Sequence, residues 1–407
     1  MTGNTSDLSD DIVQNRPPEH LSPRSRDFQP WHKVRKQFIR VRQWNDLIKK
    51  YIKTEMKHLL PVMLNHEGES VQDPHDAHLR CLTIPGDDLL DLRSLWSEIQ
   101  HTGCWIRYLG FNSSFGSNQP DTRVHLATND LNSRERVARD SNVVHGPFQS
   151  IRSIGSQAYR YLQKYGPFNI VNLDLCDSLL PSASPSGGVN EYFDALYRLF
   201  EYQMQTQKKG WLFFITTQVA PLEIDYESFK KLCQPTIDNC QAHAEFYSQL
   251  ESLTPKAVNP QSYELNLKVL SAEQVVDLFG IAFGKALLKF FNSSDQVWQV
   301  RMQTSHRYCI NPEKGVFMLS LAYELRPLFK PPTDPTGLAT IIPVTQHDYN
   351  ELELALNLIE RVKTISDVEE VLAANNGLYR ALRMSSADLL ESAGYDREEY
   401  FRWEPEQ

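Results

Sequence analysis

The chain has 407 residues, of which 41% are hydrophobic and 23% charged, a composition typical of a globular protein with two or three structural units. Its formal net charge of −9 argues against a molecule that binds polyanions over its whole surface. Six scattered cysteines without a CxxC pair indicate reduced thiols and exclude a disulfide framework as the basis of the fold.

The N-terminal sequence is polar and rich in proline. Residues 1–30 are polar, contain four prolines, and lack both a cationic start and an apolar h-region, so we expect a disordered tail and no signal peptide. No stretch approaches the roughly 20 apolar residues that would span a bilayer. The sequence therefore predicts a cytoplasmic protein with no membrane partner.

Residues 31–58 are predicted to form a basic amphipathic helix, with nine Lys and Arg against two acidic side chains. Trp31, Trp44 and Tyr51 lie among the cations, a combination that suits phosphate contacts and base stacking on nucleic acid. It equally suits docking on an acidic partner, including the acidic remainder of this chain, or a plain solvated surface. The candidate nucleic-acid or partner-binding residues are Lys33, Arg35, Lys36, Arg40, Arg42, Lys49 and Lys50.

From residue 78 onward, predicted strands alternate with helices, which implies a parallel sheet covered by helices. The predicted strands are 78–86, 104–112, 142–145, 168 onward and 211–219. The predicted helices are 87–103, 151–166, 189–209, 226–251 and 271–291, and 113–122 and 181–188 are predicted loops. Two further apolar segments joined by Asn-Pro-Glu-Lys-Gly read as an antiparallel β-hairpin at one edge. We therefore predict a Rossmann-like α/β fold.

The C-terminal region is predicted to be a linker and a helical tail. Prolines at 331–336 mark the linker, and 348–364 reads as a helix. Ser366 and Glu369 form a capping-box pattern for the next helix, with Gly377 and Gly394 as stops. The predicted organisation is a tail (1–30), a basic helix with a polar connector (31–77), a Rossmann-like domain (78–330), and a linker with helices (331–407).

Polar residues end three of the predicted parallel strands, where ligands of open α/β sheets bind. Asp174 and Asp177, with Cys176 between them, follow the apolar start of the fourth strand. Pro85-Gly86-Asp87-Asp88 follows the first strand, and Asn112 ends the second. These residues are candidates for a ligand site, although strand-end solvation, an N-cap at Gly86-Asp87 and an ordinary Asn-Ser turn are simpler explanations.

The element order over about 78–326 resembles the class I S-adenosylmethionine-dependent methyltransferase fold. The segments "PGDDLLDLR", "IRYLGFNS" and "NLDLCDS" are also similar to bacterial methyltransferase-like proteins, some linked to phage defence. This resemblance implies S-adenosylmethionine as cofactor, and Asp174 and Asp177 as the catalytic or target-orienting pair. The cofactor-binding residues that it implies are Pro85, Gly86, Asp88, Asn112 and Asp174.

The sequence departs from that family at several positions. The glycine-rich first turn is reduced to Pro85-Gly86, and Asn112 stands where a carboxylate would bind the ribose hydroxyls. The fourth strand is followed by neither an Asp/Asn-Pro-Pro-aromatic motif nor a Pro-Cys nucleophile.

Three functions therefore stay open. The first is a methyltransferase acting on nucleic acid or protein, and the second is a catalytically inactive scaffold or sensor subunit of a multi-protein complex. The third is a nuclease that would use the Asp pair with a divalent ion. Two weaker hypotheses are a Cys176 nucleophile and a metal site. The metal site would be formed by His66, His75 and His78 with Asp73 and Asp76, whose spacing matches no zinc pattern.

Overall fold

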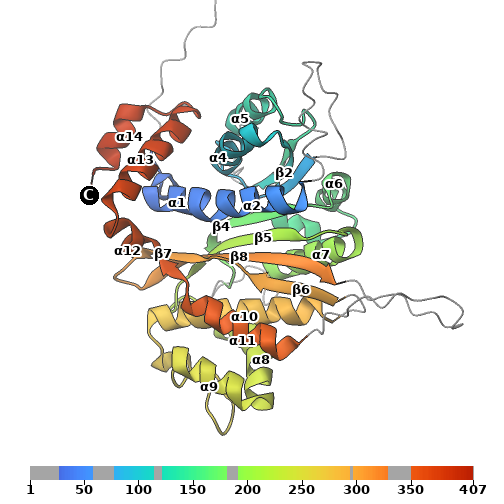
Figure 1. Cartoon of the computed structure of the whole chain (residues 1–407), viewed down its shortest axis with the longest axis vertical. Coiled ribbons are helices and arrows are strands. Elements are labelled where there is room, and N and C mark those ends of the chain that lie inside the picture. The colour runs from blue at the N-terminus through green and yellow to red at the C-terminus, as the bar shows by residue number, and fades with distance from the viewer. Residues whose placement is uncertain are drawn as a thin grey trace, which may run out of the picture.

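The computed structural model describes residues 27–57, 78–113, 122–180, 191–293, 297–328 and 350–406 (Figure 1). Most of the predicted N-terminal tail, the 61–77 connector, the loop at 181–188 and the 331–336 linker lie outside these ranges. No helix in the described ranges is long and apolar enough to cross a membrane.

A mixed sheet with strand order β3-β2-β1-β4-β5-β8-β7-β9 forms the centre of the protein. Its parallel part consists of β1 (His78–Thr83), β2 (Trp105–Asn112), β3 (Asn142–His145), β4 (Ile170–Ser178) and β5 (Trp211–Val219). β8 (Val316–Leu328) runs antiparallel to β5 on one side. On its other side β8 pairs with β6 (Val297–Met302) and then β7 (His306–Asn311), both antiparallel. The prediction of a mostly parallel Rossmann-like sheet with an antiparallel hairpin is confirmed.

The strand order reverses between β1 and β4, and we use the name strand-end crevice for the region beyond the carboxyl ends of β1, β2 and β4. The chain moves outward from β1 to β2 and β3, and then returns to β4 and β5 on the other side of β1. Helices that follow β1 and β4 therefore diverge at this point, and ligands of open α/β folds bind beyond the carboxyl ends of strands at such a switch point. The residues that end β1, β2 and β4 are therefore the candidates for a ligand site.

Helices cover both faces of the sheet (Figure 1). One face carries α1 (Val34–Phe38), η2 (Ile39–Asn45), α2 (Asp46–Glu55), α4 (Leu90–Ile99) and α5 (Thr122–Asn132). The other carries α6 (Gln157–Tyr165), α7 (Glu191–Thr206), α8 (Tyr226–Ala242), α9 (Ala244–Leu253) and α10 (Ala272–Phe291). Because both faces are covered, a central strand such as β5 reads as a nearly continuous apolar run.

The C-terminal helices divide between the two faces. α11 (Glu351–Lys363) packs on α10. α12 (Val368–Ala373) and α13 (Asn376–Glu391) instead share a core with α1 and α2, and α14 (Arg397–Trp403) packs on α13. The predicted N-terminal and C-terminal segments are therefore joined to the sheet by common hydrophobic cores.

The predicted helix over 31–58 is not one regular α-helix. A short 3-10 turn, η1 (Pro30–His32), precedes α1, and η2 between α1 and α2 is π-helical. A π turn holds more residues than an α turn, so it brings side chains from more than one face of the predicted helix inward. Arg40, Gln43, Trp44 and Asn45 of η2 are all at most 3% exposed.

Several predicted boundaries were wrong for local reasons. The helix predicted at 151–166 starts only at Gln157, because Ser156 caps it. The helix predicted at 226–251 is broken at His243 into α8 and α9. Helix α5 was missed, because few apolar residues mark it within a polar stretch. A four-residue inward pattern could have shown it: Val124, Ala127, Thr128 and Leu131.

The predicted capping box in the tail was also wrong. Asp367, one residue after Ser366, caps α12 by accepting hydrogen bonds from the backbone N–H groups of Glu369 and Glu370. Ser366 belongs to β9 (Ser366–Asp367), which pairs in parallel with β7. Gly377 lies inside α13, whereas Gly394, with a φ of 86°, follows the end of α13 as predicted.

Candidate functional site

The carboxyl ends of β1 and β2 bring two of the predicted cofactor residues together. The side-chain amide of Asn112 donates hydrogen bonds to the backbone oxygen of Pro85 at 2.9 Å and to a carboxylate oxygen of Asp87 at 3.1 Å. Asn112 is only 2% exposed. Both amide hydrogens are therefore used to hold the turn after β1.

Asp88 is held by two partners in the turn that precedes α4. Arg123 donates two hydrogen bonds to its carboxylate, at 2.9 and 2.6 Å, and the Tyr395 hydroxyl donates a third at 2.7 Å. This pairing ties the turn to α5 and to the C-terminal tail. The next residue, Leu89, has a φ of 53° and precedes α4 without a side-chain cap, so the predicted Gly-Asp N-cap is not formed.

Asp174 forms a largely buried ion pair at the end of β4. Its carboxylate lies 2.5 Å from the Nζ atom of Lys36 on α1, and the two side chains are 16% and 3% exposed. The Lys36 ammonium also lies 4.5 Å from the centre of the Trp44 ring. Burial disfavours the ammonium, but Asp174, Tyr308 and Asp91 together outweigh it and raise the pKa of Lys36, so this lysine stays cationic.

The two acids of β4 have different surroundings. Asp177 is exposed, and its backbone oxygen accepts a hydrogen bond from the Thr217 hydroxyl. The pairing of β4 with β5 shifts register between Asp174 and Ser178. Asp174 therefore contacts an N-terminal helix, whereas Asp177 faces solvent.

A buried polar seam joins α1 and η2 to the sheet and to α4. We use this name for Lys36, Arg40, Gln43 and Asn45 with their partners Asp174, Asp91, Ser320 and Ser94. The Ser320 hydroxyl also lies 2.8 Å from the Thr216 hydroxyl and donates to the Gln43 side chain. Sequence analysis missed Gln43 and Asn45. The i, i+4, i+7 spacing of Lys36, Arg40 and Gln43 was a signal that these residues share a face.

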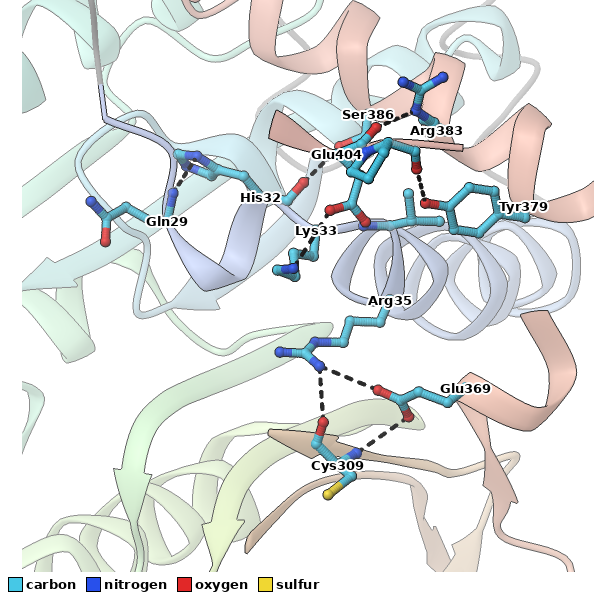
Figure 2. A network of polar contacts seen from close by, with 12 residues as sticks. Gln29, His32, Lys33, Arg35, Cys309, Glu369, Tyr379, Arg383, Ser386 and Glu404 are labelled. Atoms are coloured by element: carbon cyan, nitrogen blue, oxygen red, sulfur yellow. Dashed lines mark hydrogen bonds and ion pairs between the residues drawn. The ribbon is translucent and has the colours of Figure 1, made fainter. Parts of the chain in front are cut away.

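Three further cations of the basic helix pair with acids from distant segments of the same chain. Lys33 lies 3.7 Å from Glu404, Arg35 lies 3.3 Å from Glu369, and Lys49 lies 3.0 Å from Glu98. Figure 2 shows the first two contacts, which connect α1 to the C-terminal helices. Of the seven predicted binding residues, only Arg42 and Lys50 are exposed. The helix docks on the acidic remainder of its own chain, one of the alternatives the sequence left open.

The C-terminal tail also holds the start of α1 through backbone contacts, which together we call the clamp. Glu404 accepts a hydrogen bond from the backbone N–H of Val34, and the Ser386 hydroxyl donates to the backbone oxygen of His32 (Figure 2). The Arg383 guanidinium in turn donates a hydrogen bond to the backbone oxygen of Glu404 at 2.6 Å. The clamp is formed by segments more than 350 residues apart in the sequence.

Two buried polar atoms at the switch point have no hydrogen-bond partner within the described part of the chain. They are Oγ1 of Thr83 at the end of β1 and Oδ1 of Asn172 on β4. These two residues are register partners in the parallel pairing of β1 with β4. Their position beside Asp174 makes them part of the crevice, although the sequence analysis did not name them.

The structure adds no support for the Cys176 nucleophile or for a metal site. Burial raises the pKa of the Cys176 thiol to about 11, which leaves little thiolate at neutral pH. Among the described residues, no three His, Cys, Asp or Glu side chains are grouped to hold a metal ion. His66 and His75 lie outside the described ranges, so the predicted histidine cluster is not tested.

Comparison with known protein families gives a match to this sequence. The sequence profile of the PP_RS20740-like family matches residues 25–405, a range that includes every strand of the sheet and both helical segments of the clamp. The chain belongs to the PP_RS20740-like family. No curated protein matches the sequence.

Proposed function

We propose that this protein is a non-catalytic Rossmann-like scaffold or sensor subunit, whose strand-end crevice is closed by its own N-terminal helices. The observation that carries the proposal is the ion pair of Lys36 with Asp174, which uses the central carboxylate of the crevice inside the chain. A catalytic or orienting carboxylate has to present its oxygen atoms to a substrate. Here a ligand would first have to displace a buried ammonium, leaving a charge without its partner.

The other predicted cofactor positions support the same proposal. The Asn112 amide and the Asp88 carboxylate are engaged with Pro85, Arg123 and Tyr395, so each holds the local structure together. The described cysteines are all free, which supports a reducing, cytoplasmic setting. Arg42 and Lys50 are the exposed candidates of the basic helix for contact with an acidic protein or nucleic acid outside the crevice.

The second candidate function is S-adenosylmethionine-dependent methyl transfer to nucleic acid or protein, as in bacterial methyltransferase-like defence proteins. Two observations favour it. A Cβ atom added at Gly86 would meet no other atom within 4 Å, so the turn after β1 leaves space beside its backbone. Thr83 and Asn172 also have polar atoms at the switch point without a hydrogen-bond partner among the described residues. In this candidate, Asp177 is the acid that remains exposed to a substrate.

Calorimetric titration with S-adenosylmethionine and S-adenosylhomocysteine distinguishes the two functions. We expect no binding heat from the wild-type protein at millimolar cofactor, with folding confirmed by circular dichroism. Micromolar binding that Asp174→Asn or Asn112→Ala weakens at least tenfold would overturn the scaffold proposal.

A scaffold or sensor also predicts a stoichiometric partner. The tagged protein, purified from its host at native expression, should retain that partner through gel filtration. Arg42→Glu tests whether the exposed side of the basic helix contributes, and Arg160→Glu on α6 is the matched control, because Arg160 is also an exposed cation.

A further inference from the structure

A cavity of about 520 Å³ lies along β6, away from the strand-end crevice. It is bordered by β6, the last part of β8, α10, α11 and one residue of α2. The β8 residues that line it pair near Trp211, the first residue of β5, whereas Asp174 pairs with Thr216 farther along the same strand. The cavity therefore lies toward the amino ends of the parallel strands. Its volume is within the usual range for small-molecule sites.

Three cations from three different elements line this cavity. They are Lys50 of α2, Arg301 of β6 and Arg361 of α11. All three are exposed, and none forms an ion pair with any described residue. In contrast, Lys33, Arg35, Lys36 and Lys49 of the N-terminal helices are all paired. Convergence of unpaired cations on one hollow favours an anionic ligand, and Arg is especially suited to phosphate.

The acids near the cations do not neutralise them. Glu324 already holds Arg326 at 2.8 Å and accepts a hydrogen bond from Gln303. Glu353 lies in the first turn of α11, where the helix dipole stabilises a negative charge. The local charge of the lining is therefore positive in a protein whose net charge is −9.

The cavity also has an apolar part with an unused hydroxyl. Tyr323 lines it and is 1% exposed, and its buried hydroxyl has no hydrogen-bond partner among the described residues. Leu288, Met302 and Leu358 supply apolar surface, and the side-chain amides of Gln299 and Asn357 supply donors and acceptors. A ligand that carries both a phosphate and an apolar ring system fits this combination.

We propose that the cavity along β6 binds a nucleotide. Lys50, Arg301 and Arg361 hold the phosphates, while the base and ribose lie against Tyr323 and the apolar residues beside it. The site shares no residue with the strand-end crevice, so it does not depend on whether that crevice binds a cofactor. It also goes beyond the proposed function, because it assigns a ligand class to a region of which the sequence analysis selected only Lys50.

Calorimetry on the full chain at 50 mM salt tests the site with the four ribonucleoside triphosphates, AMP, adenosine and inorganic phosphate as probes. We expect micromolar binding of at least one nucleotide and much weaker binding of adenosine and inorganic phosphate. Arg301→Gln and Arg361→Gln should each weaken nucleotide binding at least tenfold. Arg160→Gln on α6, which removes an exposed cation outside the cavity, should leave it unchanged.

Tyr323→Phe separates a ligand contact from a structural role. The ring stacks on Phe213 and its hydroxyl has no described partner, so the variant should fold with an unchanged or higher melting temperature while it binds the nucleotide several-fold more weakly. The proposal is overturned if no nucleotide binds at millimolar concentration, or if the arginine variants bind as tightly as wild type. Inorganic phosphate that binds as tightly as AMP would overturn a nucleotide as the ligand.

Discussion

The strand-end crevice and the cavity along β6 use cations from the same N-terminal helices in opposite ways. Lys36 is buried and lies 2.5 Å from Asp174, whereas Lys50 is exposed and has no described ion-pair partner. In the sequence the two lysines look alike, as parts of one basic run. A basic helix can therefore serve mainly to stabilise the fold, while a few of its cations remain available to bind a ligand.

The largest expected effect comes from breaking the buried pair. Lys36→Met leaves the Asp174 carboxylate without its cation, and we expect a loss of about 3 to 5 kcal/mol of unfolding free energy. Urea denaturation measures it. The double variant Lys36→Met with Asp174→Leu should recover most of the loss, because no buried charge is then left alone.

The matched control for this prediction is Arg42→Met, which removes an exposed cation whose ion-pair partner among the described residues is Asp46, at 3.8 Å. It should change stability by less than about 0.5 kcal/mol. A Lys36 variant as stable as this control would show that the pair does not hold α1 on the sheet.

The second expected effect is acid destabilisation through buried histidines beside α1. Burial lowers the pKa of His306 to about 4 and that of His32 to about 3, from an ordinary value of 6.5. Between pH 6.5 and 4 the unfolded chain binds more protons at these sites than the folded one, so stability is present at neutral pH and is lost as the pH falls through this window. Each histidine contributes up to about 1.4 kcal/mol per pH unit.

Urea denaturation at pH 7, 6 and 5 measures this slope, and His306→Gln should flatten it relative to wild type. His145, which lies at the end of β3 and is exposed, provides the control variant His145→Gln. Equal slopes in all three proteins would contradict the assignment.

The third expected effect concerns the packing of α11 on α10 beside the β6 cavity. A Cβ atom at Gly284 of α10 would approach Leu358 of α11 to 2.6 Å, so Gly284→Ala should push α11 away and cost about 1 to 3 kcal/mol. Hydrogen exchange in α11 should increase, and nucleotide binding should weaken. At Gly280, one turn earlier, the nearest atom would be 3.5 Å away, so Gly280→Ala should be neutral or stabilising. Equal effects of the two substitutions would contradict the close packing of α11 at Gly284.

The smallest expected effect concerns the turn after β1. Tyr395→Phe removes one hydrogen bond to Asp88 and should lower the unfolding free energy by about 1 kcal/mol. Thermal denaturation measures it, with Tyr197→Phe as control because Tyr197 is 55% exposed. If Tyr395→Phe lowered the unfolding free energy more than Lys36→Met does, this turn would stabilise the crevice region more than the Lys36–Asp174 pair.

Local patterns were sufficient to predict the frame of the molecule. Apolar runs such as β5, separated by helical periodicities, placed each of the five parallel strands. The carboxyl ends of β1, β2 and β4 were identified as one edge, because parallel strands end together. Asn112 and Pro85 meet at this edge through a hydrogen bond.

The partners of the charged residues were decided by tertiary structure alone. Nothing near Lys36 in the sequence indicates Asp174, 138 residues away, and nothing near Val34 indicates Glu404, 370 residues away. Amphipathic periodicity marks the apolar face of a helix, but the π-helical η2 also turned polar side chains inward. The sequence by itself determined the order and type of the main elements, because these depend on neighbours. Burial and pairing of the cations depend on distant segments, so only the tertiary structure separated those that hold the fold from those that remain free to bind.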